Sequence, residues 1–216
     1  MKVFIIGAAG KVGSRLVPLL AQAGHAPLAM HRKPEQAEAL AEAGGVPVAG
    51  DIVALDEEAL ATRMAGADAV VFTAGAGGAG IALTNAIDGE GLVKAIAAAK
   101  RAGVARFVLV SAFPEAGRNA PPREGFENYM RVKKETDWKL TRSGLDWVIL
   151  RPGTLTLGEG TGTVRLGLAL PYGSVSRQDV AATLLGILER PGLSQVILEL
   201  TEGDTSINAA LDAMVS

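Results

Sequence analysis

Two side chains suited to proton transfer lie four residues apart in the second half of the chain. Tyr129 and Lys133 fall in a stretch predicted to be helical, and this spacing places them on the same helix face. A lysine ammonium beside a phenol favours the phenolate, so we expect the pKa of Tyr129 to be lowered. Such a pair can relay a proton to or from a substrate oxygen.

The same spacing also occurs on ordinary amphipathic surface helices. A Lys four residues after a given Tyr arises by chance in about one case in twenty at ordinary lysine usage. Ser111 adds a third polar group, because it ends a predicted strand at the carboxyl edge where α/β proteins form ligand sites. From the residues alone, both a catalytic group and an amphipathic surface pair stay open.

A glycine-rich turn follows the first predicted strand. The apolar run 2–6 predicts a buried parallel strand, and residues 14–23 have apolar side chains at helical spacing. Between them Gly7, Gly10 and Gly13 are spaced as G-x-x-G-x-x-G. A strand, a glycine turn and a helix are the context of a dinucleotide-binding fingerprint, although an ordinary glycine-rich turn has the same pattern.

Each glycine has a physical role in that interpretation. Gly7 permits a tight turn, Gly10 leaves room for a pyrophosphate near the backbone, and Gly13 lets the helix pack closely on the strand. The helix N-terminus then offers N–H groups and a positive dipole end to the phosphates. The residues expected to hold the pyrophosphate are Gly7, Ala9, Gly10, Lys11 and Val12.

The next two predicted strands end in residues that suit the adenosine half of a dinucleotide. Arg32 and Lys33 stand where an acidic residue would bind the ribose of NAD and where Arg accepts the 2′-phosphate of NADP, which favours NADP(H) over NAD(H). A solvated basic pair is the alternative. Asp51 can accept a hydrogen bond from the adenine amino group while Ile52 covers the ring, although Asp after a strand is also a common turn cap.

A second glycine cluster lies after the fourth predicted strand. Residues 75–80 match G-x-G-x-x-G, and we expect the following helix to begin near an N-cap at Thr84. In a doubly wound sheet this loop faces the first one across the crevice, so both can touch the same cofactor. A flexible connection is the alternative interpretation.

Alternating strands and helices predict the fold class α/β, a Rossmann-like doubly wound parallel sheet flanked by helices. We expect a single domain over residues 1–216, in which 152–216 contribute a small substrate-side cap. Pro47 suggests an edge strand, and Ser176 with Asp179 suggests a capping box. The predicted strands are 2–6, 26–31, 46–50, 67–73, 106–110, 147–150 and 196–200, and the predicted helices are 14–23, 34–43, 55–64, 84–102, 123–142, 177–189 and 207–214.

Composition excludes several classes of function. With 49% hydrophobic residues, 20% charged residues and a net charge of −2, the chain shows no bias toward nucleic acid or a membrane surface. Cysteine is absent, and His25 with His31 lacks a ligand spacing, so we expect no metal. No convincing signal peptide or membrane span is present, so we expect a cytoplasmic monomer or homodimer acting on a small molecule.

Taken together these residues resemble the short-chain dehydrogenase/reductases. The resemblance covers nearly the whole chain and is strongest to the atypical group related to NAD(P)-dependent epimerases and NmrA-like proteins. The segment 143–153, which ends in Arg151-Pro152-Gly153, is the most specific match, and residues 176–181 are similar to the segment before the family's late helix.

The resemblance implies a role for each candidate residue. Lys133 binds the nicotinamide ribose, Tyr129 is the acid/base, and Ser111 orients the carbonyl of the substrate. The implied cofactor contacts are Gly7, Gly10 and Val12 for the pyrophosphate, Asp51 and Ile52 for the adenine, and Ala74, Gly75 and Ala76 for the ribose and nicotinamide side.

The leading expectation is therefore an NADPH-dependent reductase of a small carbonyl, quinone or flavin-like compound. The main alternative is a non-catalytic NADP(H) sensor that regulates a protein partner. A sugar-nucleotide epimerase is a weaker third alternative, because the cap is much shorter than in those enzymes.

Overall fold

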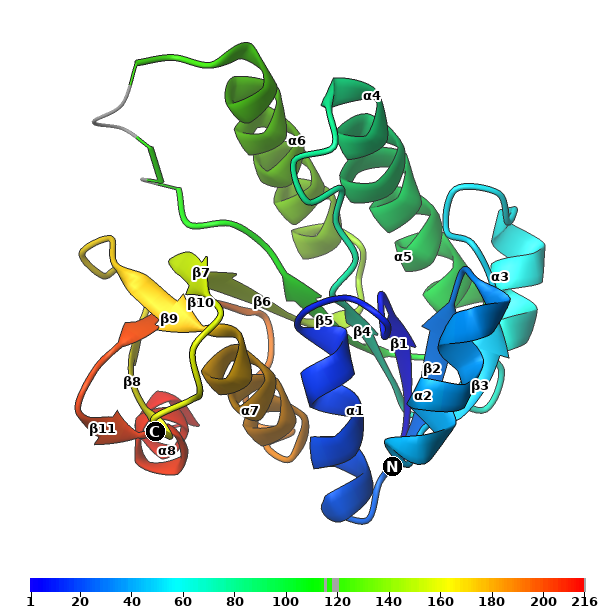
Figure 1. Ribbon diagram of the computed structural model, residues 1–216, viewed down its shortest axis with the longest axis horizontal. Helices are drawn as coiled ribbons and strands as arrows, with labels where there is room; N and C mark the ends of the chain where they lie inside the picture. Colours follow the sequence, from blue (N-terminus) through cyan, green and yellow to red (C-terminus); the bar gives the residue numbers. More distant parts are fainter. Residues whose placement is uncertain (115, 118–120, 216) are drawn as a thin grey trace.

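The computed structural model describes residues 1–114, 116–117 and 121–215. A nine-stranded sheet, in the order β11-β8-β10-β6-β5-β4-β1-β2-β3, runs through the molecule (Figure 1). The seven strands from β3 to β10 in that order are parallel, whereas β8 runs antiparallel to β10 and to β11. Their bounds are β1 (Lys2–Ile6), β2 (Ala26–His31), β3 (Val46–Ala49), β4 (Ala69–Phe72), β5 (Arg106–Val110), β6 (Asp146–Pro152), β8 (Thr163–Gly167), β10 (Val196–Glu202) and β11 (Thr205–Ser206).

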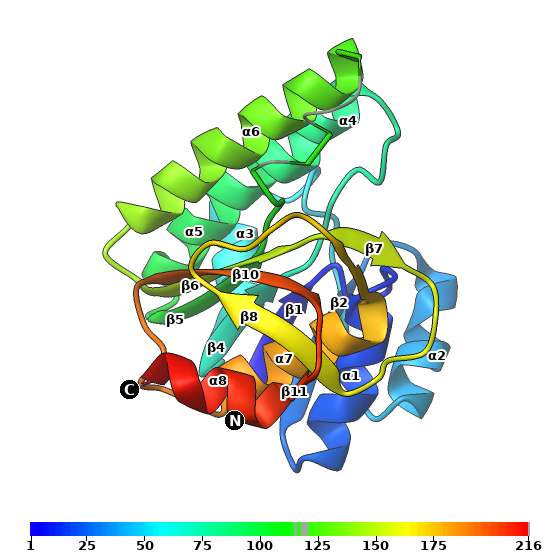
Figure 2. The same cartoon turned by 90° about the vertical axis from the view of Figure 1, so that its left-hand side faces the viewer.

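Helices cover both faces of this sheet, which confirms the predicted α/β fold class. Figure 2 shows α5 and α6 on one face and α1, α7 and α8 on the other. The helices are α1 (Gly13–Gln22), α2 (Ala37–Glu42) after the short 3₁₀ turn η1 (Pro34–Gln36), α3 (Glu57–Met64), α4 (Ile81–Thr84), the π-helical segment η2 (Asn85–Gly91), α5 (Leu92–Arg101), α6 (Glu124–Thr141), α7 (Arg177–Leu188) and α8 (Ile207–Val215).

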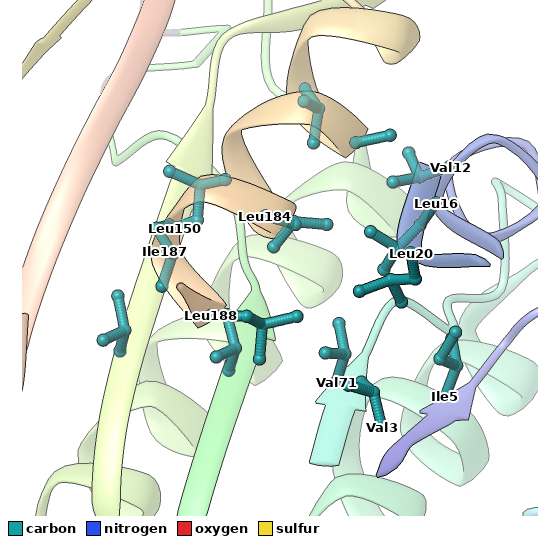
Figure 3. Packing of buried hydrophobic residues seen from close by; sticks show 14 of the residues in the cluster. Val3, Ile5, Val12, Leu16, Leu20, Val71, Leu150, Leu184, Ile187 and Leu188 are labelled. Atoms are coloured by element: carbon teal, nitrogen blue, oxygen red, sulfur yellow. The ribbon is translucent and has the colours of Figure 1, made fainter. Parts of the chain in front are cut away.

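The alternation of side chains along each strand divides the core into two layers. Val3 and Ile5 of β1 belong to one buried cluster, whereas Phe4 and Ile6 of the same strand belong to the other. In the first layer α1 and α7 pack side by side on the sheet (Figure 3). The helical side chains labelled there are Leu16 and Leu20 from α1, and Leu184, Ile187 and Leu188 from α7.

The helix after β4 differs from the sequence prediction. Its first turn begins at Ile81, after Gly80 with φ +104°, so Thr84 is not the N-cap. The Thr84 hydroxyl instead donates to the Gly80 carbonyl oxygen at 3.1 Å, a bond made one turn back within a helix. The following π-helical segment η2 widens the helix locally, a feature often found at functional sites.

Most of the described chain beyond β6 extends the central sheet and its helical layer. β10 pairs with β6, β8 adds to β10, and the remaining two strands, β7 (Thr154–Thr156) and β9 (Ser174–Ser176), form a separate parallel pair. Strands β7, β8, β9 and β11 are not among the strands predicted from the sequence, although Val164 and Leu166 of β8 do alternate with Thr163, Arg165 and Gly167. In the described part of the chain, no helix is long and apolar enough to cross a membrane.

One local prediction from the sequence is confirmed and another is confirmed in part. β3, which contains Pro47, is an edge strand of the sheet. Ser176 caps α7, since its hydroxyl accepts a hydrogen bond from the Asp179 N–H at 2.9 Å, but the capping box is incomplete, because the Asp179 carboxylate accepts from the Ser176 hydroxyl at 2.8 Å instead of its N–H. The buried Asp179 carboxylate also accepts hydrogen bonds from the N–H groups of Thr161, at 3.1 Å, and Gly162, at 2.9 Å, so the cap anchors the loop before β8.

Close backbone contacts explain why two of the three glycine positions in the first turn have no room for a side chain. Gly7 has φ +92°, and a Cβ there would lie 2.6 Å from the Ala74 backbone nitrogen. A Cβ on Gly13 would overlap the Gly7 carbonyl oxygen. On Gly10 it would approach only the Gly7 carbonyl group, at 3.0 Å from the oxygen, among the residues that the structure describes. Of the three glycines, Gly10 therefore has the most free space at the position of a Cβ.

We predict that Gly13→Ala lowers the free energy of unfolding by about 2 kcal/mol more than Gly10→Ala does, because only the first forces two backbone segments apart. Urea denaturation of the two variants and the unchanged protein measures this difference. Equal losses of stability would contradict the assignment of Gly13 to packing.

Candidate functional site

The turn after β1 and the loop after β4 contact each other at the carboxyl edge of the sheet. The Thr73 hydroxyl lies 3.2 Å from the carbonyl oxygens of both Ile6 and Gly7, to which it can donate. Gly7 in turn packs against Ala74. No side chain caps α1, but the N–H groups of Ser14 and Arg15 already donate to the carbonyl oxygens of Gly10, at 2.9 Å, and Val12, at 3.0 Å. An anion above Gly10 would therefore meet the turn before Ser14 and the positive end of the helix dipole. The structure thus brings Gly7 and Gly10 together with Ala74, as the topology predicted.

The end of β2 presents two basic side chains to solvent. Arg32 is exposed and makes no hydrogen bond or ion pair with any residue in the described ranges. Lys33 is also exposed, and its ammonium lies 3.7 Å from the Glu35 carboxylate. The carbonyl oxygen of Lys33 is 3.0 Å from the His31 Nδ1, so this histidine helps to fix the bend after the strand. Arg32 is thus the freer cation of the pair.

A lysine side chain of α5 holds the loop after β3. Asp51 Oδ1 accepts a hydrogen bond from the Val53 N–H at 2.9 Å, so Asp51 does make the local turn that was the alternative to adenine binding. Its second carboxylate oxygen is not used in that bond. The Lys94 ammonium donates to the carbonyl oxygens of Ile52, at 2.9 Å, Val53, at 3.2 Å, and Leu55. Lys94 therefore fixes this loop beside the edge of the sheet.

A buried carboxylate that the sequence analysis missed organises the loop after β4. Asp88 is 1% exposed and lies in the π-helical segment η2. Its Oδ2 accepts a hydrogen bond from the Ala76 N–H at 3.0 Å, and its Oδ1 is 3.6 Å from the Lys133 ammonium. Gly75 must be small here, because a Cβ would lie 3.2 Å from Asp88 Oδ1. Asp88 thus joins the loop to α6.

Lys133 is accordingly a buried residue of this edge rather than part of a surface pair. It is 3% exposed and donates a hydrogen bond to the Val110 carbonyl oxygen at 3.0 Å, at the end of β5. The ion pair with Asp88 and this carbonyl hold the ammonium between α6, η2 and the sheet.

A second buried network surrounds Ser111. The Ser111 hydroxyl donates to Asp137 Oδ1 at 2.6 Å. Asp137 Oδ2 accepts two hydrogen bonds from the Arg151 guanidinium, at 3.0 Å from Nε and 2.8 Å from Nη2. Asp137 is not among the residues predicted from the sequence, although it lies one further helical turn beyond Lys133 on the same face of α6.

The prediction that Lys133 lowers the pKa of Tyr129 is wrong in direction. Burial raises the pKa of Tyr129 well above its ordinary value, and the negative charges of Asp88 and Asp137 raise it further. The lysine does not outweigh them, because its charge is already paired with Asp88. Tyr129 is therefore a protonated hydroxyl, able to donate a hydrogen bond, and not a stabilised phenolate.

Ser111 and Tyr129 line the same small pocket of about 120 Å³. Its walls are mainly apolar and include Phe113, which is 1% exposed, and Tyr172. The rings of Phe113 and Tyr172 meet edge to face with their centroids 5.4 Å apart. Leu155 of β7 lines the same pocket, so the pocket lies between the end of β5, helix α6 and the segment beyond β6.

A larger hollow, of about 560 Å³, lies elsewhere, between the end of α7 and α8. Its basic residue Arg190 is bound to Asp212 at 2.8 Å, and it contains none of the candidate residues. Among the described residues no cluster of His, Asp and Glu suits a metal ion. His25 lies 3.4 Å from Glu189, a local surface contact.

Similarity to known proteins agrees with this geometry. A curated relative described as an uncharacterised sugar epimerase, YhfK of Bacillus subtilis, is 42% identical over 213 residues, which cover 98% of this chain and 99% of the relative. A Bacillus halodurans structure provisionally described as an NAD-dependent epimerase/dehydratase has a TM-score of 0.90 at 34% identity, covering 99% of each chain. ChuY of Escherichia coli O157:H7, an anaerobilin reductase, has a TM-score of 0.78 at 27% identity, covering 95% of this chain and 99% of its own.

The family that matches is described as NAD(P)H-binding, and the match spans residues 7–191. This range begins at the first glycine of the turn and includes Arg32, Asp88, Lys133 and Arg151. The chain therefore belongs to the NAD(P)H-binding family, with a Rossmann-like fold shared with epimerase/dehydratase-like proteins and oxidoreductases.

Proposed function

We propose that this protein is an NADPH-dependent reductase of a small carbonyl, quinone or flavin-like compound. The observation that carries the proposal is that the glycine turn after β1 and the pocket after β5, which Ser111 and Tyr129 line, both lie at the carboxyl edge of the same parallel sheet. The similarity to ChuY, a reductase, supports the same reaction class.

The residues at the carboxyl edge of the sheet suit the parts of an NADPH molecule. The pyrophosphate would lie over Gly10 and the uncapped N-terminus of α1, in contact with the turn from Ala9 to Val12. Arg32 is free to bind the 2′-phosphate, with Lys33 beside it. Asp51 and Ile52 would contact the adenine, and the segment 74–76 with Lys133 would contact the nicotinamide ribose.

When bound, NADPH would supply the hydride that reduces the substrate carbonyl. Tyr129 would donate its phenolic proton to the carbonyl oxygen, which gives the alcohol. The raised pKa makes Tyr129 a weaker acid than a free phenol, so the proton would pass to an oxygen that hydride addition is already making strongly basic. Phe113 and Tyr172 give the pocket aromatic walls that suit a planar ring.

A non-catalytic NADP(H) sensor is the second candidate, and one observation favours it. Lys133 and Ser111 are each bound to a buried carboxylate, Asp88 and Asp137, as in a structural network. The epimerase alternative has less support, because a pocket of about 120 Å³ is too small for a sugar nucleotide.

We expect the protein to bind NADPH more tightly than NADH, and Arg32→Ala to remove most of that difference. The loss of a charge-assisted contact to the 2′-phosphate should weaken NADPH binding by about ten- to a hundredfold, with little effect on NADH. Calorimetric titration of both cofactors measures this. Arg101→Ala, which removes an exposed arginine of α5, is the matched control. Equal affinities of the unchanged protein for the two cofactors would contradict the NADP assignment.

We expect Tyr129→Phe to lower the turnover of a substrate found by screening quinones, flavins and small aldehydes by about 10²–10⁴-fold, since it removes the proton donor. NADPH affinity should be unchanged. Tyr172→Phe, in the other tyrosine of the same pocket, is the control and should keep most of the activity. Full activity of Tyr129→Phe would remove the assignment, and no activity of the unchanged protein on any compound would favour the sensor.

A further inference from the structure

The Ser111 hydroxyl has a fixed direction because its partner can only accept. Asp137 is a carboxylate with no proton to give, and its Oδ1 lies 2.6 Å from the Ser111 oxygen. The single hydroxyl proton of Ser111 is therefore used in this bond. What the serine can still offer a ligand is its lone pairs.

Arg151 keeps Asp137 in this orientation. Its guanidinium has donors only, and two of them bind Asp137 Oδ2, which leaves Oδ1 for the serine. The pair is well shielded, since the side chain of Asp137 is 5% exposed and that of Arg151 is 18% exposed. A rotation of the carboxylate would break three hydrogen bonds at once.

We infer that Asp137, held by Arg151, is a positioning residue that makes Ser111 a hydrogen-bond acceptor toward the pocket, so that the site selects ligands that present an O–H or N–H group there. This inference deepens the proposed function and rests on it for the reaction. Because Tyr129 supplies a donor in the same pocket, the favoured substrate is a carbonyl compound with a hydroxyl or N–H group close to the carbonyl.

This assignment reverses the role that the family resemblance implies for Ser111. A serine that orients a substrate carbonyl must donate its proton to that oxygen, and here the proton is bound to Asp137. Ser111 thus lines the pocket, but its hydrogen-bonding sense in this structure is the opposite of the one that the resemblance implies.

The test compares two single-ring probes, of which only one carries a hydrogen-bond donor. 4-Fluorobenzyl alcohol carries an O–H donor, whereas 4-fluorobenzaldehyde carries only an acceptor, and their sizes are nearly equal. A pocket of about 120 Å³ is of the size that holds one ring. Titration followed by ¹⁹F NMR gives both dissociation constants without turnover, so a failure of the reductase proposal would appear in the activity assay and leave this preference unchanged.

The unchanged protein should bind the alcohol about five- to tenfold more tightly than the aldehyde. This ratio corresponds to the usual free-energy contribution of one hydrogen bond. Ser111→Ala should remove the preference. Asp137→Asn should also remove it, because the amide oxygen must face the donors of Arg151 and its NH₂ group then donates to Ser111. The serine proton is then free for the pocket, where the oxygens of both probes can accept it.

Three results would overturn the inference. One is an equal affinity of the unchanged protein for the two probes, or no binding of either at millimolar concentration. Another is an alcohol preference that survives Ser111→Ala. The third is an Asp137→Asn protein that folds, by circular dichroism, and keeps the original preference. A merely structural role of Asp137 would weaken the binding of both probes together and would leave the preference for the alcohol unchanged.

Discussion

The candidate site depends on one buried ion pair, between Asp88 and Lys133. Both side chains are almost fully shielded, 2% and 4% exposed, so neither charge can be left without its partner. Removal of one member of such a pair typically costs about 3–5 kcal/mol, because the other charge stays buried and unpaired. The pair therefore fixes the distance between η2 and α6, and through the Ala76 N–H it fixes the loop after β4 as well.

The pairing of charges also decides what the polar groups of the pocket can do. Lys133 is neutralised by Asp88, and burial with two nearby carboxylates keeps Tyr129 protonated. Asp137 is neutralised in turn by Arg151 and holds the proton of Ser111. The result is a pocket with one donor and one acceptor hydroxyl. In the proposed reductase, the hydride would come from the cofactor, and the chain would supply orientation and a proton.

The glycine turn, the strand ends and the helix that carries Tyr129 and Lys133 could be predicted because they depend on local spacing. Strands β1, β2 and β5 have the predicted bounds for the same reason. Asp88 could not be found this way, since its role depends on a π-helical turn and on a partner far along the chain. The pKa of Tyr129 was mispredicted because the sequence showed its lysine neighbour but not the two carboxylates that fold against it.

The most direct test of this account is a crystal structure of the protein with NADPH. The account predicts the pyrophosphate over Gly10 at the N-terminus of α1 and the 2′-phosphate against Arg32. It also predicts the nicotinamide ring at the pocket that Ser111 and Tyr129 line. A cofactor bound elsewhere, or one whose nicotinamide points away from that pocket, would contradict the assignment of this edge of the sheet as the reaction site.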